Sequence, residues 1–174
     1  MGAGSSAVPA VDGGMSWGML LHLGTNMWEE GAADWGGFPR SLEEERRTYP
    51  EKQKLTEFGT LPCVNRNYLR AERDVWSAET ELMRAEGLNA VVIDIGEALA
   101  YPSHPELAVA GSWSPDDMRA ELRRLRGMGL EPIPKLNFST CHDAWLKEYH
   151  CMVSTPKYYE VVADVIRDVC EVFD

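Results

Sequence analysis

The chain lacks the features that place a protein in a membrane or on nucleic acid. Its longest apolar runs, such as residues 90–93, are far too short to span a bilayer. Basic residues are few, because 17 Lys and Arg stand against 28 Asp and Glu, and the formal charge is −11. Such a charge disfavours nucleic acids and anionic membranes as partners, and it favours a neutral or cationic small molecule.

The chain also has few cysteines, and it lacks the sequence motifs of common metal and nucleotide sites. The four cysteines form no C-x-x-C pair, so we expect neither a disulfide framework nor a zinc ribbon, and we expect reduced thiols. The sequence contains no HExxH, no G-x-S-x-G and no dinucleotide fingerprint. These absences predict no metal, no cofactor and no hydrolysis by a Ser-His-Asp triad.

The N-terminal residues carry no targeting signal. Residues 1–14, MGAGSSAVPAVDGG, lack a basic start and an apolar centre, and no hydrophobic stretch follows Arg46-Arg47. The sequence as given therefore predicts a cytoplasmic protein with a flexible leader over residues 1–14. We expect one domain over residues 15–174, with residues 29–72 as a long connection rich in charge and in Gly and Pro.

What the sequence does contain is a repeated junction between a helix and a strand. Residues 87–95 read GLNAVVIDI and residues 129–138 read GLEPIPKLNF, and each follows a helical pattern. The glycine of each phrase suits a helix C-terminus, and the leucine opens a strand. Strands alternating with helices over short connections predict a parallel sheet with right-handed crossovers. The expected strands cover residues 17–26, 89–96 and 132–138.

Three helices are expected between and after these strands, over residues 73–86, 115–128 and from 156 onward. Ser114 suits an N-cap, and Pro115 suits the first helical position. Apolar residues at helical spacing predict the buried stripes. These are Val75, Trp76, Leu82 and Met83 in the first helix, Met118, Leu122, Leu125 and Met128 in the second, and Tyr158, Val162, Val165, Ile166, Val169 and Phe173 in the third.

The connections differ in length at the two ends of the strands. Those after the strands are long and polar, whereas those after the helices have only a few residues. This asymmetry is typical of a (β/α)₈ TIM-type barrel, in which chemistry occupies one rim. Because a full barrel needs roughly 250 residues, we expect a partial barrel of about three strand–helix units. An open doubly wound sheet is the alternative. Exposed strand edges would allow self-association.

Polar side chains close the first two strands. His22, Asn26 and Trp28 follow one another along the first strand, where His22 either orients a substrate hydroxyl or is a hydrogen-bonded core histidine. An indole at Trp28 offers a flat platform for a sugar ring. Asp94 and Glu97 close the second strand and suit acid/base work or the binding of hydroxyls. We expect Tyr101 and His104, in the loop that follows, to be ordinary loop residues.

The third strand leads into the densest cluster, within KLNFSTCHDAW. Lys135 and Asn137 lie on the strand end, and His142, Asp143 and Trp145 follow in the loop. This pattern favours hydrogen bonding to a polyhydroxylated ligand beside an aromatic wall. Asp94 and Lys135 lie on adjacent predicted strands among aliphatic residues, so a structural ion pair is the alternative to a role in chemistry.

Three phrases carry a resemblance to a known family. WGMLLHLGTNMW, GLNAVVIDIGEALAYPSHPEL and GLEPIPKLNFSTCHDAWL resemble the N-terminal part of an uncharacterised family of (β/α)₈-barrel proteins, often described as twin-arginine-signal proteins. That family is similar in layout to glycoside hydrolases such as the β-hexosaminidases. The resemblance covers most of residues 15–174. It implies a third-strand loop with a histidine followed by a tryptophan, as His142 and Trp145 are.

The expected function is therefore a glycoside hydrolase-like, carbohydrate-active barrel. The resemblance implies that the catalytic acidic pair follows a fourth strand, which would begin after Asp174, and it leaves export open. We expect the isolated chain to be inactive, and the alternative is a truncated barrel that serves as a carbohydrate-binding or interaction module. The expected ligand-binding residues are His22, Asn26, Trp28, Asp94, Glu97, Lys135, Asn137, His142, Asp143 and Trp145.

Overall fold

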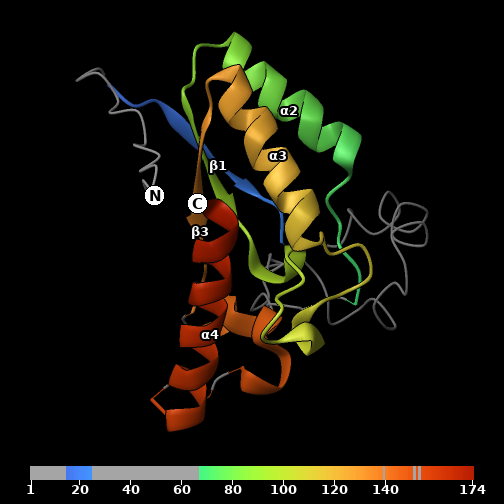
Figure 1. Cartoon of the computed structure of the whole chain (residues 1–174), viewed down its shortest axis with the longest axis vertical. Helices are drawn as coiled ribbons and strands as arrows, with labels where there is room; N and C mark the ends of the chain where they lie inside the picture. The colour runs from blue at the N-terminus through green and yellow to red at the C-terminus, as the bar shows by residue number, and fades with distance from the viewer. Residues whose placement is uncertain (1–14, 25–66, 139, 151, 153) are drawn as a thin grey trace, which may run out of the picture.

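A parallel three-stranded sheet forms the centre of the protein (Figure 1). The computed structural model describes residues 15–24 and 67–174, except residues 139, 151 and 153, so the predicted leader and most of the long connection lie outside it. The strands are β1 (Gly18–His22), β2 (Ala90–Asp94) and β3 (Glu131–Lys135), in the order β1-β2-β3. Both strand pairs are parallel, which confirms the predicted α/β class, although each strand is shorter than predicted.

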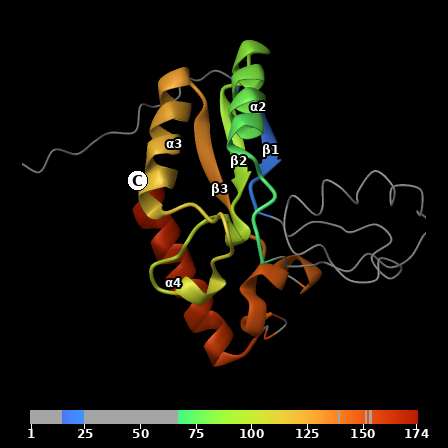
Figure 2. The ribbon, with the colours of Figure 1, turned by 90° about the vertical axis from the view of Figure 1, so that its right-hand side faces the viewer.

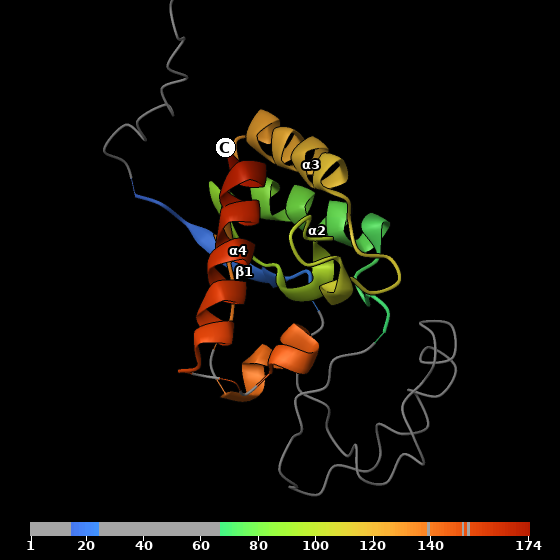
Figure 3. The same cartoon turned by 60° about the horizontal axis from the view of Figure 1, so that its bottom comes forward.

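Two helices lie side by side on one face of the sheet (Figures 2 and 3). These are α2 (Arg73–Ala85) and α3 (Pro115–Met128), and the Trp76 indole N–H of α2 donates a hydrogen bond of 2.8 Å to Glu121 of α3. The third long helix, α4 (Pro156–Phe173), packs against α3. Short 3₁₀ segments complete the described chain: η2 (Gly96–Ala98), η3 (Pro105–Leu107) and η4 (Thr140–Tyr149).

Helix α3 begins and ends where the sequence predicts. The Ser114 hydroxyl accepts a hydrogen bond from the Asp117 amide, while the Asp117 carboxylate accepts one from the Ser114 amide, so the two residues form a capping box. Gly129 ends the helix with a φ of 83°, a left-handed conformation that glycine adopts without steric cost.

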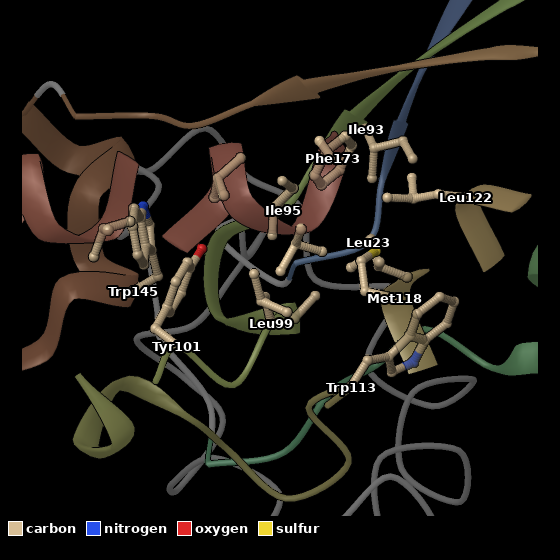
Figure 4. Close-up of a cluster of buried hydrophobic side chains, with 14 of the residues drawn as sticks. Leu23, Ile93, Ile95, Leu99, Tyr101, Trp113, Met118, Leu122, Trp145 and Phe173 are labelled. Carbon is tan, nitrogen blue, oxygen red and sulfur yellow. The ribbon is translucent and has the colours of Figure 1, made fainter. Parts of the chain in front are cut away.

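The core lies between the sheet and the helices (Figure 4). Val91 and Ile93 of β2 point to this side and are fully buried, because β2 has a neighbouring strand on each side and helices above it. Figure 4 shows Leu23, Ile95, Leu99 and Met118 as members of one buried cluster. Of the stripe predicted for α3, Met118, Leu122 and Leu125 are fully or almost fully buried and Met128 is partly buried.

The predicted stripes of α2 and α4 are wrong in part. Val75 and Leu82 are 52% and 54% exposed, and on α4 Ile166 is 43% exposed. Helix α2 buries Trp76 and Met83 as predicted, and with them Thr80, which lies between them at helical spacing. Val75 and Leu82 each lie one position before a buried residue, and Ile166 lies one position after one, which is about 100° around the helix. Helix α4 buries two valines that the prediction omitted, Val161 and Val172.

The opposite face of the sheet exposes apolar side chains. Leu20, Val92 and Ile133 are paired in register across the three strands, so their side chains share one face. Leu20 is 40% exposed and Ile133 is 44% exposed. This face of the sheet therefore carries a partly exposed row of apolar side chains.

The outer edge of β3 lacks hydrogen-bond donors at two positions. The Glu131 amide donates to Asn89 and the Lys135 carbonyl accepts from Ile95, so alternate residues of β3 face β2. The intervening residues, Pro132 and Pro134, therefore direct their backbone away from β2, and proline has no N–H to donate. At these two positions the edge presents only carbonyl acceptors to an added strand.

We predict that Pro134→Val increases self-association, because valine restores an outward N–H on this edge. Analytical ultracentrifugation over a concentration series should show a larger average mass for this variant than for the wild type. Ile133→Val is the matched control. The backbone of residue 133 faces β2 and not the outer edge, so this substitution should leave the average mass unchanged. An unchanged mass for a folded Pro134→Val variant would contradict the interpretation of this edge.

Candidate functional site

A row of polar side chains lies at the C-terminal ends of the three strands. His22, Asp94 and Lys135 are paired in register at the C-terminal ends of β1, β2 and β3, so their side chains lie on the same face. Asn137 follows two residues after Lys135. The Oδ2 atom of Asp94 accepts hydrogen bonds from His22 Nδ1 at 3.0 Å, Lys135 Nζ at 2.7 Å and Asn137 Nδ2 at 2.8 Å. We call these four residues the Asp94 cluster.

Burial divides the Asp94 cluster into an inner acceptor and outer donors. The Asp94 side chain is 0% exposed, whereas the side chains of His22 and Lys135 are 35% and 32% exposed. The predicted ion pair between Asp94 and Lys135 is therefore present, and a ligand approaching from solvent meets the imidazole and the ammonium group first. Because an ionised carboxylate can only accept, His22 Nδ1 carries the proton in this contact.

The amide of Asn137 is oriented by two contacts. Its Nδ2 donates to Asp94, and its Oδ1 accepts from Lys135 Nζ at 2.9 Å. The backbone carbonyl of Asn137 accepts a hydrogen bond of 2.9 Å from the Trp145 indole. Hydrogen bonds thus hold both the side chain and the main chain of this residue, which fixes its orientation in the Asp94 cluster.

Gly24 brings the end of β1 against the end of β2. The amides of Leu23 and Gly24 both donate to the Asp94 carbonyl at 3.0 Å. A Cβ atom at position 24 would lie 2.7 Å from the Ile95 carbonyl oxygen, closer than real Cβ atoms come to a backbone atom. Glycine is therefore required here for the close approach that places His22 beside Asp94.

The structure corrects the role predicted for Trp145. The side chain is fully buried, with ring centroids 5.8 Å from Tyr101 and 5.9 Å from Phe138, and Figure 4 shows it beside Tyr101. A buried indole cannot form the aromatic wall of a cleft. It supports the Asp94 cluster indirectly, through the hydrogen bond from its indole N–H to the Asn137 carbonyl.

Two further predicted carboxylates are also buried. Glu97 in η2 and Asp143 in η4 are 0% exposed, and His150 Nε2 lies 3.2 Å from Asp143. Burial, and then the negative charge of Glu97, hold the pKa of the Tyr101 hydroxyl well above its usual range. His142, in η4, is half-buried. Of the predicted ligand-binding residues, Asn26 and Trp28 lie outside the described residues.

Tyr101 and His104 are not the ordinary loop residues that the sequence suggests. Tyr101 is 1% exposed and donates a hydrogen bond of 2.6 Å to the Gly96 carbonyl, whereas His104 is 7% exposed. His104 lies 2.8 Å from Glu106 and 3.5 Å from Asp164, so it connects the loop after β2 to α4. A histidine between prolines gives no periodic signal, and only the tertiary fold brings Asp164 to it.

No known protein family, curated protein or solved structure matches this chain. The geometry of its own residues therefore carries the functional argument. Over the described part of the chain, no group of three or more His, Cys, Asp or Glu side chains could hold a metal ion. Within the same residues, no helix combines the length and apolar character needed to cross a membrane.

The ion pair inside the Asp94 cluster should contribute measurably to stability. Lys135→Met should lower the free energy of unfolding by about 2 kcal/mol, because it leaves a buried carboxylate with fewer donors while His22 and Asn137 remain. The double variant Asp94→Asn with Lys135→Met should recover much of this loss. Urea unfolding followed by circular dichroism gives these values.

Lys157→Met is the matched control for this cycle. Lys157 forms an exposed pair with Glu160 at 3.4 Å, so its loss should change the free energy of unfolding by less than about 0.5 kcal/mol. Strictly additive losses for Asp94→Asn and Lys135→Met would show that the two residues are not coupled.

The glycine at the end of β1 gives a further test. Gly24→Ala should lower the free energy of unfolding by about 2–3 kcal/mol, because the new methyl group meets backbone atoms that cannot move aside. Gly127→Ala, within α3, is the control: nothing lies within 4 Å of its added Cβ, so it should be neutral or stabilising. Equal unfolding midpoints for the two variants would contradict the close approach.

Proposed function

We propose that the Asp94 cluster binds a polyhydroxylated ligand, and that the chain is the N-terminal part of a carbohydrate-active (β/α)₈ barrel resembling glycoside hydrolases. The observation that carries this proposal is the row of His22, Asp94 and Lys135 at the C-terminal ends of three parallel strands. Parallel α/β proteins bind their ligands at that end of the sheet.

The chemistry of the cluster suits hydroxyl groups, which both donate and accept hydrogen bonds. Lys135 Nζ directs two of its three N–H bonds to Asp94 and Asn137, so the third is available for a ligand oxygen. In a neutral His22 whose Nδ1 donates to Asp94, Nε2 is an acceptor for a ligand hydroxyl. The donor on β3 and the acceptor on β1 lie on either side of Asp94, and together they suit the hydroxyl groups of a sugar ring.

The described residues favour binding over bond cleavage. A glycosidase of the common type needs two carboxyl groups roughly 5–9.5 Å apart across the scissile bond. Asp94 accepts three hydrogen bonds through one oxygen, and Glu97 and Asp143 are fully buried. Binding and orientation are therefore the role of this part of the barrel, and burial of the carboxylates favours the alternative of a non-catalytic carbohydrate-binding module for the chain by itself.

The test is binding of simple sugars by the chain. Methyl glycosides of glucose, galactose, mannose, fucose and N-acetylglucosamine are titrated in ligand-observed NMR, and at least one should bind with a Kd in the millimolar range. Asn137→Leu and Lys135→Met should weaken that binding at least tenfold, because each removes donors, while Lys157→Met should not change it. The same chain should not hydrolyse the corresponding 4-nitrophenyl glycosides.

Two outcomes would overturn this proposal. Absence of binding for every methyl glycoside by the folded wild-type chain would exclude the Asp94 cluster as a sugar site. Turnover of a 4-nitrophenyl glycoside that is abolished by Asp94→Asn or Glu97→Gln would instead assign catalysis to residues that we assign to binding and structure.

A further inference from the structure

Helix α4 exposes a continuous apolar stripe along one side. Its members are Tyr159, Ala163, Ile166 and Cys170, which are all exposed and follow one another at intervals of four, three and four residues. At about 100° per residue, these positions fall on one side of the helix over about three turns. Tyr159 is 59% exposed and Ile166 is 43% exposed, so the two largest members present much of their surface to solvent. We call these four residues the α4 stripe.

The α4 stripe is separate from the side of the helix that faces the core. Val161 and Val165 are fully buried and lie two positions after Tyr159 and Ala163, which is about 200° around the helix. Scattered exposed apolar residues are normal on protein surfaces, whereas a contiguous row marks a place of contact. The intervals of four, three and four residues are those of the a and d positions of a heptad repeat, the seam along which two helices pack.

Two side chains of opposite charge border the α4 stripe on one flank. Glu160 and Arg167 each follow a stripe residue and are seven positions apart, so they lie on the same side of the helix. Their side chains are 63% and 62% exposed. Each has a partner within the helix, Lys157 at 3.4 Å for Glu160 and Asp164 at 2.7 Å for Arg167. Exposed pairs of this kind contribute little to stability, so both side chains can change partner at low cost.

This charge pattern is complementary to itself only when two copies of α4 run antiparallel. A two-fold axis between antiparallel helices brings each flank of one helix against the same flank of the other, with the chain direction reversed. Glu160 of one copy then meets Arg167 of the second, and the reciprocal pair forms as well. In a parallel pair the charged flank meets the opposite flank, where Val162 and Val169 offer no charge.

We propose that the α4 stripe is a dimer interface, on which a second copy of this chain packs its own α4 in antiparallel orientation. The centre of the contact lies between Ala163 and Ile166, so each of these residues packs against the other one in the second copy. At the two ends, Tyr159 packs against Cys170 of the second copy. The inference does not depend on the proposed function, because the α4 stripe contains no residue of the Asp94 cluster.

The dimer is weak, because net charge opposes it. Each chain carries a formal charge of −11, which repels a second copy at long range. Burial of the α4 stripe and two reciprocal ion pairs have to offset this repulsion over the contact of one helix pair. We therefore expect a dissociation constant on the order of 10–100 µM, as for small interfaces.

Sedimentation equilibrium over a concentration series measures this association. The wild-type chain should dimerise with the dissociation constant given above, and Ile166→Glu should weaken the dimer at least tenfold, because it places a charge in the apolar seam. Val75→Glu is the matched control, since Val75 is a 52% exposed residue on α2. A wild-type chain that stays monomeric at about 1 mM overturns the inference. So does a dimer that Val75→Glu weakens as strongly as Ile166→Glu.

Disulfide cross-linking distinguishes the antiparallel from the parallel arrangement. Tyr159→Cys places a thiol opposite the native Cys170 of the second copy, so mild oxidation should link position 159 of one chain to position 170 of the other, as identified by peptide mass spectrometry. Tyr159→Cys with Cys170→Ser is the matched control. Like positions at the ends of this antiparallel pair lie about 16 Å apart, which is too far for a disulfide. A link between the two copies of Cys170 in the wild-type chain indicates a parallel pair and overturns the inference.

Charge reversal tests the two ion pairs. Glu160→Arg and Arg167→Glu each bring like charges together across the interface and should each weaken the dimer at least fivefold. An equimolar mixture of the two variants should form a heterodimer more tightly than either homodimer, because every pair then joins opposite charges. A mixture of Glu160→Arg with Arg84→Glu, a change on α2 with the same net charge, is the matched control and should show no such preference. Equal behaviour of the two mixtures overturns the inference.

Discussion

Burial of the Asp94 carboxylate is the constraint on which the rest of this site depends. An isolated buried carboxylate would cost several kcal/mol, so donors have to converge on it. They come from both neighbouring strands: His22 from β1, and Lys135 and Asn137 from β3 and the residues after it. The carboxylate therefore fixes the positions of three polar side chains that solvent or a ligand can reach from the open face.

The backbone around the cluster is arranged to make this convergence possible. Gly24 allows the end of β1 to approach the end of β2 more closely than a residue with a Cβ atom could. On the other side, Trp145 is buried behind the cluster and holds the Asn137 carbonyl. Trp145, which the sequence suggested as an aromatic wall for a ligand, thus supports the cluster from within the core. Gly24, which has no side chain, allows the backbone geometry of the site.

The two faces of the sheet explain how one small α/β unit combines a stable core with an accessible site. Val91 and Ile93 point toward α2 and α3 and are completely buried. Leu20 and Ile133 point the other way and remain substantially exposed, on the same face as His22 and Lys135. The polar row thus borders a partly exposed apolar surface on the open face of the sheet.

Local patterns in the sequence by themselves determined the element order and the helix ends, and they placed Asp94 and Lys135 on neighbouring strands. Capping signals such as Ser114-Pro115 act within a few residues, and the period of a buried strand is local as well. Only the tertiary structure decided which residues are reachable: that Val75 and Leu82 are exposed, and that Trp145 and Glu97 are buried. Exposure depends on which segments, distant in sequence, pack over a side chain.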